Sequence, residues 1–170
     1  MLEPRRLAAR ASARRIAAIM GEQVGGTVGY RTRFDTKVSS ATRIEVLTEG
    51  ILTRLIQEDP ELAGIDTVIF DEFHERSIHA DLALALCLDI RSALRNDLKL
   101  LVMSATIDTT RVSALLGSAP VIESPGKMYP VRTVYRKRLD PAAPLERDAV
   151  SAIRTAVQSD PGDLLVFLPG

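Results

Sequence analysis

The stretch that decides the fold is Asp66-Thr67-Val68-Ile69-Phe70-Asp71-Glu72-Phe73-His74, a short apolar run that ends in two carboxylates. Its β-branched and aromatic residues predict a strand, and its unbroken apolar character is typical of a strand buried on both faces of a parallel sheet. In such sheets, ligands bind beyond the carboxyl ends of the strands. Asp71 and Glu72 therefore mark a candidate ligand site, although two solvated acids at a strand end are the simpler alternative.

Short strands and amphipathic helices alternate on both sides of this stretch. The predicted strands are 28–33, 43–47, 66–70, 99–103 and 121–122. The predicted helices are 5–20, 51–57, 80–94 and 109–116. Strands separated by helices imply an α/β fold, with a parallel sheet flanked by helices.

The C-terminal part predicts a second domain. A strand at 131–135 is followed by Asp140-Pro141-Ala142-Ala143-Pro144, which is typical of a linker. A helix at 145–158 and a buried strand at 164–167 then follow. We expect one domain over residues 1–139, and a linker with the first elements of a second domain over residues 140–170.

The composition is that of a globular protein, with 46% hydrophobic and 26% charged residues. No run approaches the roughly 18 apolar residues of a membrane helix, and the N-terminus has no signal-peptide pattern. The single cysteine, Cys87, excludes an internal disulfide and is expected to be a small core residue. These features predict a cytosolic protein without a membrane segment.

The charges are unevenly distributed although the net charge is zero. Residues 1–56 hold ten Lys/Arg against five Asp/Glu, and residues 57–170 hold twelve against seventeen. A basic start with an acidic remainder is compatible with an anionic polymer on one face and a metal site on another. Overall neutrality argues against nucleic-acid binding through bulk charge alone.

Two other motifs follow predicted strands. Thr48-Glu49-Gly50 leads into a helix, where backbone N–H groups and the Thr48 hydroxyl can receive a phosphate, although a plain capping turn explains it equally well. Ser104-Ala105-Thr106 places two hydroxyls where they can bond His74 or the acids. For this tripeptide alone, a helix-capping turn is the favoured alternative.

Cations gather near the start of the chain. Pro4-Arg5-Arg6 opens the first predicted helix, and Arg6, Arg10 and Arg14 form a stripe along it. Such a stripe is usually a solvated face, but arginines at a helix start can also hold a sugar-phosphate backbone. The segment 29–34 mixes cations with aromatic residues, as an ordinary half-exposed strand also does.

The order of the motifs is more informative than any single one. EPRRLAAR (3–10), TEG (48–50), DEFHERS (71–77) and SAT (104–106) resemble motifs Ia, Ib, II and III of superfamily 2 helicases, and specifically the DEAH-box group. The resemblance covers essentially the whole chain. It implies an incomplete first RecA-like helicase domain over residues 1–139 and the start of a second over residues 140–170, with 165–170 as its first strand.

The resemblance also implies roles for single residues. Asp71 would hold the Mg²⁺ of ATP through a water, and Glu72 would orient the water that attacks the γ-phosphate. Three residues would couple hydrolysis to domain movement: His74, Ser104 and Thr106. Six would contact the backbone of RNA or single-stranded nucleic acid: Pro4, Arg5, Arg6, Thr48, Glu49 and Gly50.

The chain departs from the group's pattern at Phe73, where the group's name has Ala, and at Lys127, where relatives often have Arg. We expect Phe73 to enlarge the surface at the strand end without altering the chemistry of the acids. The phosphate-binding P-loop, G-x-x-x-x-G-K-[ST], and the arginine-finger motif are absent from the 170 residues. In the family the P-loop lies just upstream of the first residue here.

The missing motifs predict a truncated piece that needs the remainder of a helicase chain, and that by itself neither hydrolyses ATP nor unwinds a duplex. The absent P-loop strand would leave apolar surface and an unpaired strand edge exposed. A non-catalytic RecA-like scaffold that binds nucleic acid is the alternative, and the intact acids disfavour it. A transporter ATPase is disfavoured by HERS and TEG.

Overall fold

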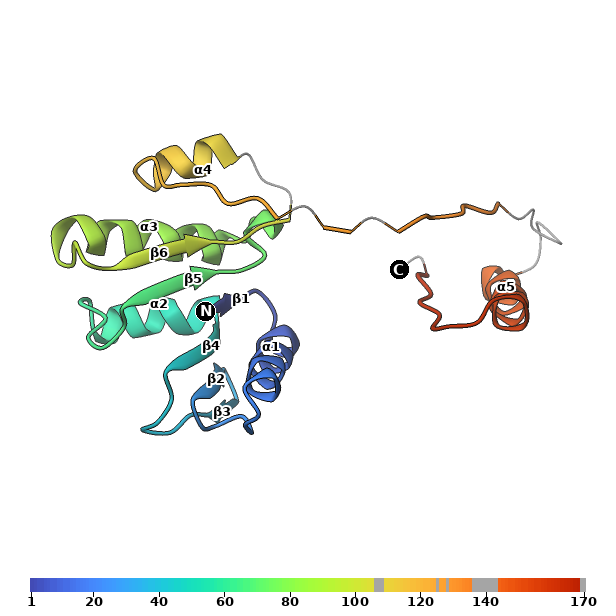
Figure 1. Cartoon of the computed structure of the whole chain (residues 1–170), viewed down its shortest axis with the longest axis horizontal. Helices are drawn as coiled ribbons and strands as arrows, with labels where there is room; N and C mark the ends of the chain where they lie inside the picture. Colours follow the sequence, from blue (N-terminus) through green and yellow to red (C-terminus); the bar gives the residue numbers. More distant parts are fainter. Residues whose placement is uncertain (106–108, 125, 128, 136–143, 169–170) are drawn as a thin grey trace. The chain divides into compact units, whose positions relative to one another are not determined.

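The computed structural model describes residues 1–105, 109–124, 126–127, 129–135 and 144–168. The chain divides into two compact units, Met1–Glu123 and Ser124–Gly170. The larger unit contains a six-stranded sheet with helices packed against it (Figure 1).

The sheet has the strand order β3-β2-β4-β1-β5-β6. All neighbouring strands run parallel except β3, which pairs antiparallel with β2 at one edge. The strands are β1 (Leu2–Glu3), β2 (Val28–Thr32), β3 (Asp35–Lys37), β4 (Ile44–Thr48), β5 (Thr67–Phe70) and β6 (Lys99–Val102). The predicted α/β class, with a mostly parallel sheet flanked by helices, is confirmed.

Strand β1 is two residues long and nevertheless lies in the middle of the sheet. Leu2 pairs with Leu47 of β4 on one side and with Phe70 of β5 on the other. Because the three strands are parallel, the residues after each of them reach the same edge of the sheet. At the other end of the order, β6 is the edge strand among the described residues, and its Leu101 is exposed.

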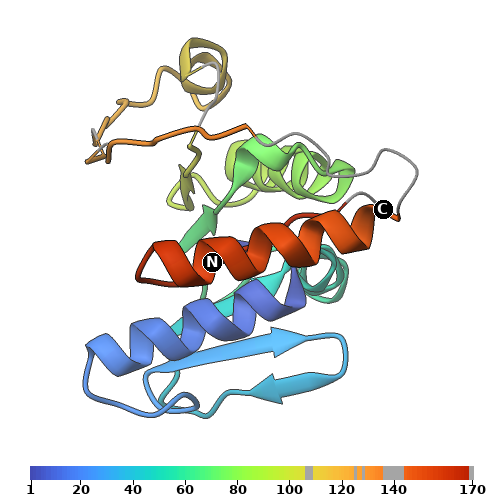
Figure 2. The same ribbon diagram turned by 90° about the vertical axis from the view of Figure 1, so that its right-hand side faces the viewer.

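One face of the sheet is covered by α1 (Arg6–Ile19), which runs alongside the β2–β3 hairpin (Figure 2). Its buried alanines, Ala9, Ala13 and Ala17, recur every four residues and so lie on one side of the helix. Their small side chains allow a close approach to the sheet, where they pack in one buried cluster: Ala9, Ala13, Ala17, Val28, Tyr30 and Val46.

The other face is covered by α2 (Glu49–Glu58) and α3 (Ile78–Ala93), with the short α4 (Thr109–Leu115) following β6. The larger core cluster lies here and includes Leu47, Phe70 and Cys87. Burial raises the pKa of the Cys87 thiol to about 12. Cys87 is therefore a core residue, as the sequence predicts.

Three predicted strands are absent from the described structure: 121–122, 131–135 and 164–167. A β-strand forms only where its backbone can hydrogen-bond to an adjacent strand. These segments have no such neighbour among the described residues. Conversely, β3 was not predicted, because its sequence Asp35-Thr36-Lys37 is polar throughout. It forms because it continues from β2 as the second strand of a hairpin.

The smaller unit contains α5 (Leu145–Ser159), close to the predicted helix. Its apolar side and residues 164–168 line a cavity of about 330 Å³. Lys127, the second departure from the helicase pattern, lies with its ammonium 5.3 Å from the centre of the Tyr129 ring. Most of the predicted linker, 140–144, and residues 169–170 lie outside the described residues, so the second domain stays a prediction.

Candidate functional site

The candidate site is built around the loop that follows β5, residues 71–77. Glu72 and Arg76 both have left-handed backbone conformations, with φ of 50° and 51°, and they flank a single turn of 3-10 helix, η1 (Phe73–Glu75). Such conformations cost on the order of 1 kcal/mol or more for residues other than glycine, so the surroundings must impose them. Here the Phe73 N–H donates to the Met103 carbonyl at 3.1 Å, and the Glu72 N–H donates to Asp71 Oδ1 at 2.8 Å.

Phe73 anchors this loop in the core. Its side chain is only 4% exposed, and its ring meets that of Phe70 edge to face at 6.2 Å and 80°. The guanidinium of Arg76 lies 5.7 Å from the centre of the same ring. The expectation that Phe73 enlarges the surface at the strand end is therefore wrong, because its neighbour on the strand offers an apolar ring to pack against.

A third carboxylate, Glu3, lies near Asp71 and Glu72. It is 3% exposed and accepts a hydrogen bond of 2.7 Å from Ser12 Oγ of α1. Burial raises the pKa of Glu3, the Ser12 hydrogen bond opposes this shift, and the charges of Asp71 and Glu72 add to it. Sequence reasoning missed Glu3, because only the pairing of β1 beside β5 brings it to the two acids.

The acids suit a hard cation that has other ligands as well. The described residues contain no group of three or more His, Cys, Asp or Glu side chains that could hold a metal alone. Mg²⁺ is usually bound by one or two carboxylates and completes its shell with phosphates and waters. The carboxylate of Asp71, at the carboxyl end of β5, fits a Mg²⁺ of that kind.

His74 lies between the acids and the turn after β6. The Ala105 N–H donates to His74 Nδ1 at 3.4 Å, and Glu72 Oε2 is also 3.4 Å from Nδ1. One ring nitrogen cannot accept from Ala105 and donate to Glu72 at the same time, so these contacts exclude each other. Ser104 Oγ is buried and has no partner among the described groups, and Thr106 lies outside the described residues. Among the described groups of this segment, the backbone N–H of Ala105 is the one that reaches His74.

The same loop contacts the segments after β1 and β4. Glu75 Oε1 accepts a hydrogen bond of 2.9 Å from Arg5, the residue that precedes α1. Ser77 Oγ donates to Glu49 Oε2 at 2.6 Å, in the first turn of α2. Thr48 occupies the N-cap position of α2 without a side-chain capping bond. Thus the loop after β5 touches the residues that follow β1, β4 and β6.

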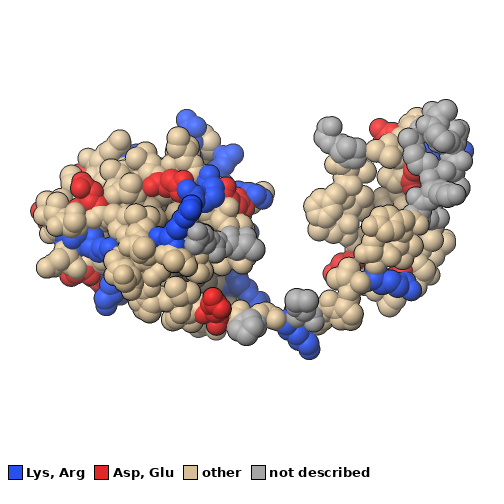
Figure 3. All heavy atoms as spheres, turned by 90° about the horizontal axis from the view of Figure 1, so that it is seen from above, with Lys and Arg blue, Asp and Glu red and all other residues tan. Residues whose placement is uncertain are grey.

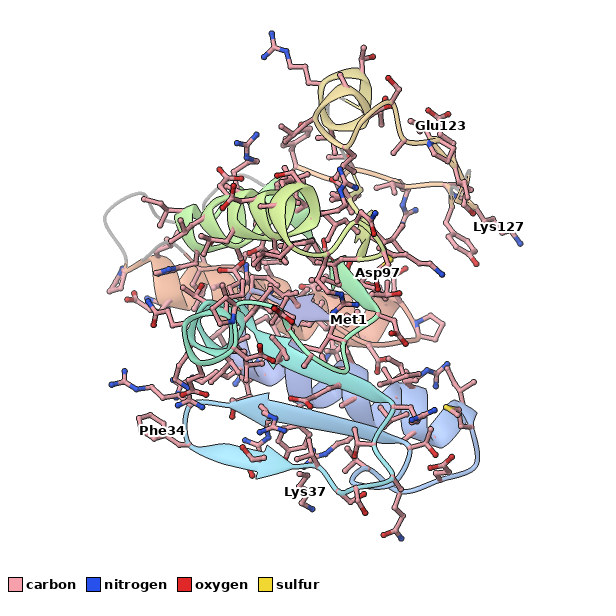
Figure 4. All side chains as sticks on the ribbon, turned by 90° about the vertical axis from the view of Figure 1, so that its left-hand side faces the viewer. Met1, Phe34, Lys37, Asp97, Glu123 and Lys127 are labelled. Atoms are coloured by element: carbon pink, nitrogen blue, oxygen red, sulfur yellow. The ribbon has the colours of Figure 1, made fainter. Side chains whose placement is uncertain are left out.

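The arginine stripe of α1 lies against the β2–β3 hairpin. The guanidiniums of Arg6 and Arg33 lie 5.9 and 5.2 Å from the centre of the Phe34 ring, which is 78% exposed. Phe34 lies at the end of the hairpin and projects from it (Figure 4). Arg10 is held between the Tyr30 ring, at 6.0 Å, and the Asp35 carboxylate, at 3.3 Å. The stripe is therefore partly engaged rather than simply solvated.

Acidic and basic side chains adjoin each other on the face of the larger unit that Figure 3 shows. The ion pairs of the larger unit include Arg5 with Glu75 and Arg31 with Glu45. This mixed surface agrees with the expectation that the chain does not bind nucleic acid through bulk charge alone. Among the described helices, none is long and apolar enough to cross a membrane.

Comparison with known proteins finds close relatives of this chain among bacterial helicases. It is 54% identical over 172 residues to the ATP-dependent RNA helicase HrpB of Escherichia coli strain K12, covering 100% of this chain and 21% of HrpB. It is 43% identical to the ATP-dependent RNA helicase HrpA of the same strain, covering 99% of this chain and 13% of HrpA. No protein-family model matches.

Solved structures give the same result. A crystal structure of the E. coli DEAH/RHA helicase HrpB matches 99% of this chain with a TM-score of 0.87 and 51% identity, over 22% of that protein. A crystal structure of the E. coli DExH-box NTPase HrpB matches the whole chain with a TM-score of 0.75. The chain thus spans about a fifth of the length of HrpB. Over that span, it is a close homologue of the HrpB and HrpA ATP-dependent RNA helicases, and its structure matches that of HrpB.

Proposed function

We propose that this chain is the part of an ATP-dependent RNA helicase that holds the magnesium-binding and water-orienting acids together with part of the nucleic-acid contacts. The observation that carries the proposal is the meeting of four motif segments at one edge of the sheet. The loop after β5 bonds to Arg5 after β1, to Glu49 after β4, and to Met103 and Ala105 after β6. Such contacts would connect an ATP site physically to a surface that binds the nucleic-acid strand, called the strand-binding surface below.

At the ATP site, Asp71 would hold Mg²⁺ through a water, and the ion would neutralise charge on the phosphates. Glu72 would orient the attacking water, and about half of its side chain is accessible for this. His74 contacts either Glu72 or the backbone N–H of Ala105, which suits the proposed coupling of hydrolysis to movement. The larger unit would then be most of a first RecA-like domain, with 140–170 beginning the second.

The strand-binding surface would use the helix starts that follow β1 and β4. Its residues are Pro4, Arg5, Arg6, Thr48, Glu49 and Gly50. The exposed Phe34 ring, flanked by Arg6 and Arg33, extends this surface. Aromatic rings on which bases stack, set beside cations that hold phosphates, are common in proteins that bind single-stranded nucleic acid.

The groups that would cradle the triphosphate are not among these 170 residues, since no P-loop motif is present. We therefore expect the purified chain to show no appreciable ATP hydrolysis, with or without RNA. Robust RNA-stimulated phosphate release from it would contradict this part of the proposal.

The decisive experiment is Glu72→Gln in the full-length protein that contains this segment. Glutamine keeps the size of the side chain but cannot take a proton from water, so ATP binding is retained and turnover falls by roughly 10²-fold or more. Glu58→Gln is the matched control, because Glu58 pairs with Arg54 on the exposed side of α2. Unchanged turnover in Glu72→Gln would remove Glu72 from the mechanism.

The second candidate function is a scaffold that binds nucleic acid without hydrolysing ATP. This candidate requires the proposed nucleic-acid contacts but no P-loop. It predicts that the full-length, unmutated protein binds single-stranded RNA but releases no phosphate from ATP. The same phosphate-release assay therefore separates the two candidates.

A further inference from the structure

Glu75 stands out because its partner is one of the proposed phosphate ligands. The pair between Glu75 and Arg5 is open to solvent, with side-chain exposures of 34% and 73%. Exposed ion pairs of this kind are weak. A phosphate group offers a guanidinium the same arrangement of acceptor oxygens as a carboxylate does. Nucleic acid that reaches Arg5 therefore competes directly with Glu75.

Glu75 is also joined to Glu72 through a very short path. The Glu75 N–H donates to the Glu72 carbonyl at 2.9 Å and closes the single turn η1. The turn lies between two residues in the left-handed conformation, Glu72 and Arg76. A displacement of Glu75 cannot be absorbed by a long flexible segment, because only two residues, Phe73 and His74, separate it from Glu72.

The neighbouring side chains Arg76 and Ser77 of the loop have different kinds of partner. Arg76 pairs with Asp81 at 2.9 Å and lies over Phe73. Ser77 accepts two backbone N–H groups of α3 while it donates to Glu49. Among the described ion pairs of the loop, the pair of Glu75 with Arg5 is thus the one that includes an arginine proposed to bind phosphate.

We propose that Glu75 is a positioning residue that holds Arg5 in the absence of nucleic acid and releases it to a phosphate of the bound strand. Release of Glu75 lets η1 shift and changes the placement of Glu72. Binding of nucleic acid at the start of α1 is thereby linked to the acids at the ATP site. The inference rests on the proposed function, and it adds a residue and a route to it.

The test is Glu75→Gln in the full-length protein, with ATP hydrolysis measured without RNA and at saturating single-stranded poly(U). Glutamine removes the charge that holds Arg5, so the rate without RNA rises and the stimulation ratio falls. We expect a fall of about two- to fivefold, the range that an exposed ion pair can supply. The affinity for poly(U) is unchanged or higher, because Arg5 is no longer occupied. The unfolding temperature verifies that the variant is folded.

A double-mutant cycle shows whether Glu75 acts through Arg5. If it does, Glu75→Gln has no further effect on the stimulation ratio in an Arg5→Gln background. Additive effects, or an unchanged ratio in Glu75→Gln, would overturn the inference. Glu58→Gln, which removes another exposed ion pair, must leave the ratio unchanged. A full-length protein that RNA does not stimulate at all would overturn the proposed function itself.

Discussion

The hydroxyl of Ser77 joins two helices, because it donates a hydrogen bond of 2.6 Å to Glu49 Oε2 at the start of α2 and also caps α3. In its second role it accepts from the backbone N–H groups of His79 and Ala80 at 3.1 and 3.3 Å. A hydroxyl has one proton and two lone pairs, so all of its bonding capacity is used. Ser77 therefore fixes the start of α3 relative to the TEG turn.

Ser77→Ala removes both the cap and the bond between the helices. A lost N-cap costs about 1 kcal/mol and a lost side-chain hydrogen bond about 1 kcal/mol more. We expect the free energy of unfolding, measured in urea, to fall by about 1–3 kcal/mol. Ser92→Ala is the control, since Ser92 is an exposed residue of α3 that bonds only within its helix. Equal losses in the two variants would contradict the double role of Ser77.

Sequence reasoning found the elements that have a strong pattern of their own. The strand before Asp71 and the helix after Ser77 were predicted within about two residues, because an apolar run and an amphipathic period are local signals. The central position of β1 could not be predicted, because two residues carry no period. It depends on the pairing of Leu2 with strands that lie 45 and 68 residues further along the chain.

In the candidate site, too, local sequence signals could be predicted and long-range contacts could not. The motif residues were identified by sequence, and the strand order brings their segments to one edge. The contacts of Glu3 with Ser12 and of Glu75 with Arg5 were not foreseen. Each joins residues whose proximity depends on helix packing and register, which no single stretch of sequence encodes.

Two glycines allow opposite predictions about substitution by alanine. A Cβ at Gly29 would lie 2.5 Å from the Lys37 carbonyl oxygen and 2.8 Å from Val38 Cγ1, so β2 and β3 would have to move apart. A Cβ at Gly50, in α2, meets nothing within 4 Å. Overpacking costs about 1–3 kcal/mol, whereas replacing glycine in a helix gains about 0.5–1 kcal/mol.

Gly29→Ala is therefore expected to lower the urea midpoint of this chain and Gly50→Ala to raise it. Gly50→Ala has a further use, because it tests a proposed backbone contact without loss of stability. If RNA affinity falls in the full-length Gly50→Ala protein while the unfolding temperature rises, the lower affinity is due to loss of the proposed contact between RNA and the backbone at Gly50. A lower unfolding temperature in Gly50→Ala would show that the helix start has a constraint that the structure does not reveal.

Phe34 tests the proposed strand-binding surface. Its exposed ring contributes little to the core, so Phe34→Ala is expected to leave the unfolding temperature nearly unchanged. Loss of one stacked base costs about 1–3 kcal/mol, which corresponds to a fall of roughly five- to 150-fold in affinity for single-stranded RNA. Phe34→Trp, which keeps an aromatic face, retains binding. Equal affinities of the alanine variant and the unmutated protein would exclude stacking at this ring.

Arg95 and Asp97 form a two-point ion pair ahead of β6. Arg95 Nε and Nη2 donate to the two Asp97 carboxylate oxygens at 2.8 and 2.6 Å. The same guanidinium donates to the carbonyls of Glu61, Leu62 and Ile65 and so secures the turn before β5. The hydrogen bonds from Arg95 lower the pKa of Asp97 (Figure 4) from its ordinary value of 3.8 to about 2.

The lowered pKa makes stability depend on pH with a definite sign. Between pH 3.8 and about 2 the unfolded chain binds the Asp97 proton and the folded chain does not. The contribution of Asp97 is therefore complete above pH 3.8 and is lost as the pH falls toward 2. Asp97→Asn lacks this contribution at every pH.

The urea midpoints of Asp97→Asn and the unmutated chain should accordingly differ most near neutral pH and converge as the pH falls toward 2. Asp81→Asn is the matched control, because it removes the carboxylate of a different exposed pair, with Arg76, and leaves Arg95 bound to Asp97. A difference between Asp97→Asn and the unmutated chain that stays constant from neutral pH to pH 2 would show that the pair does not set this titration.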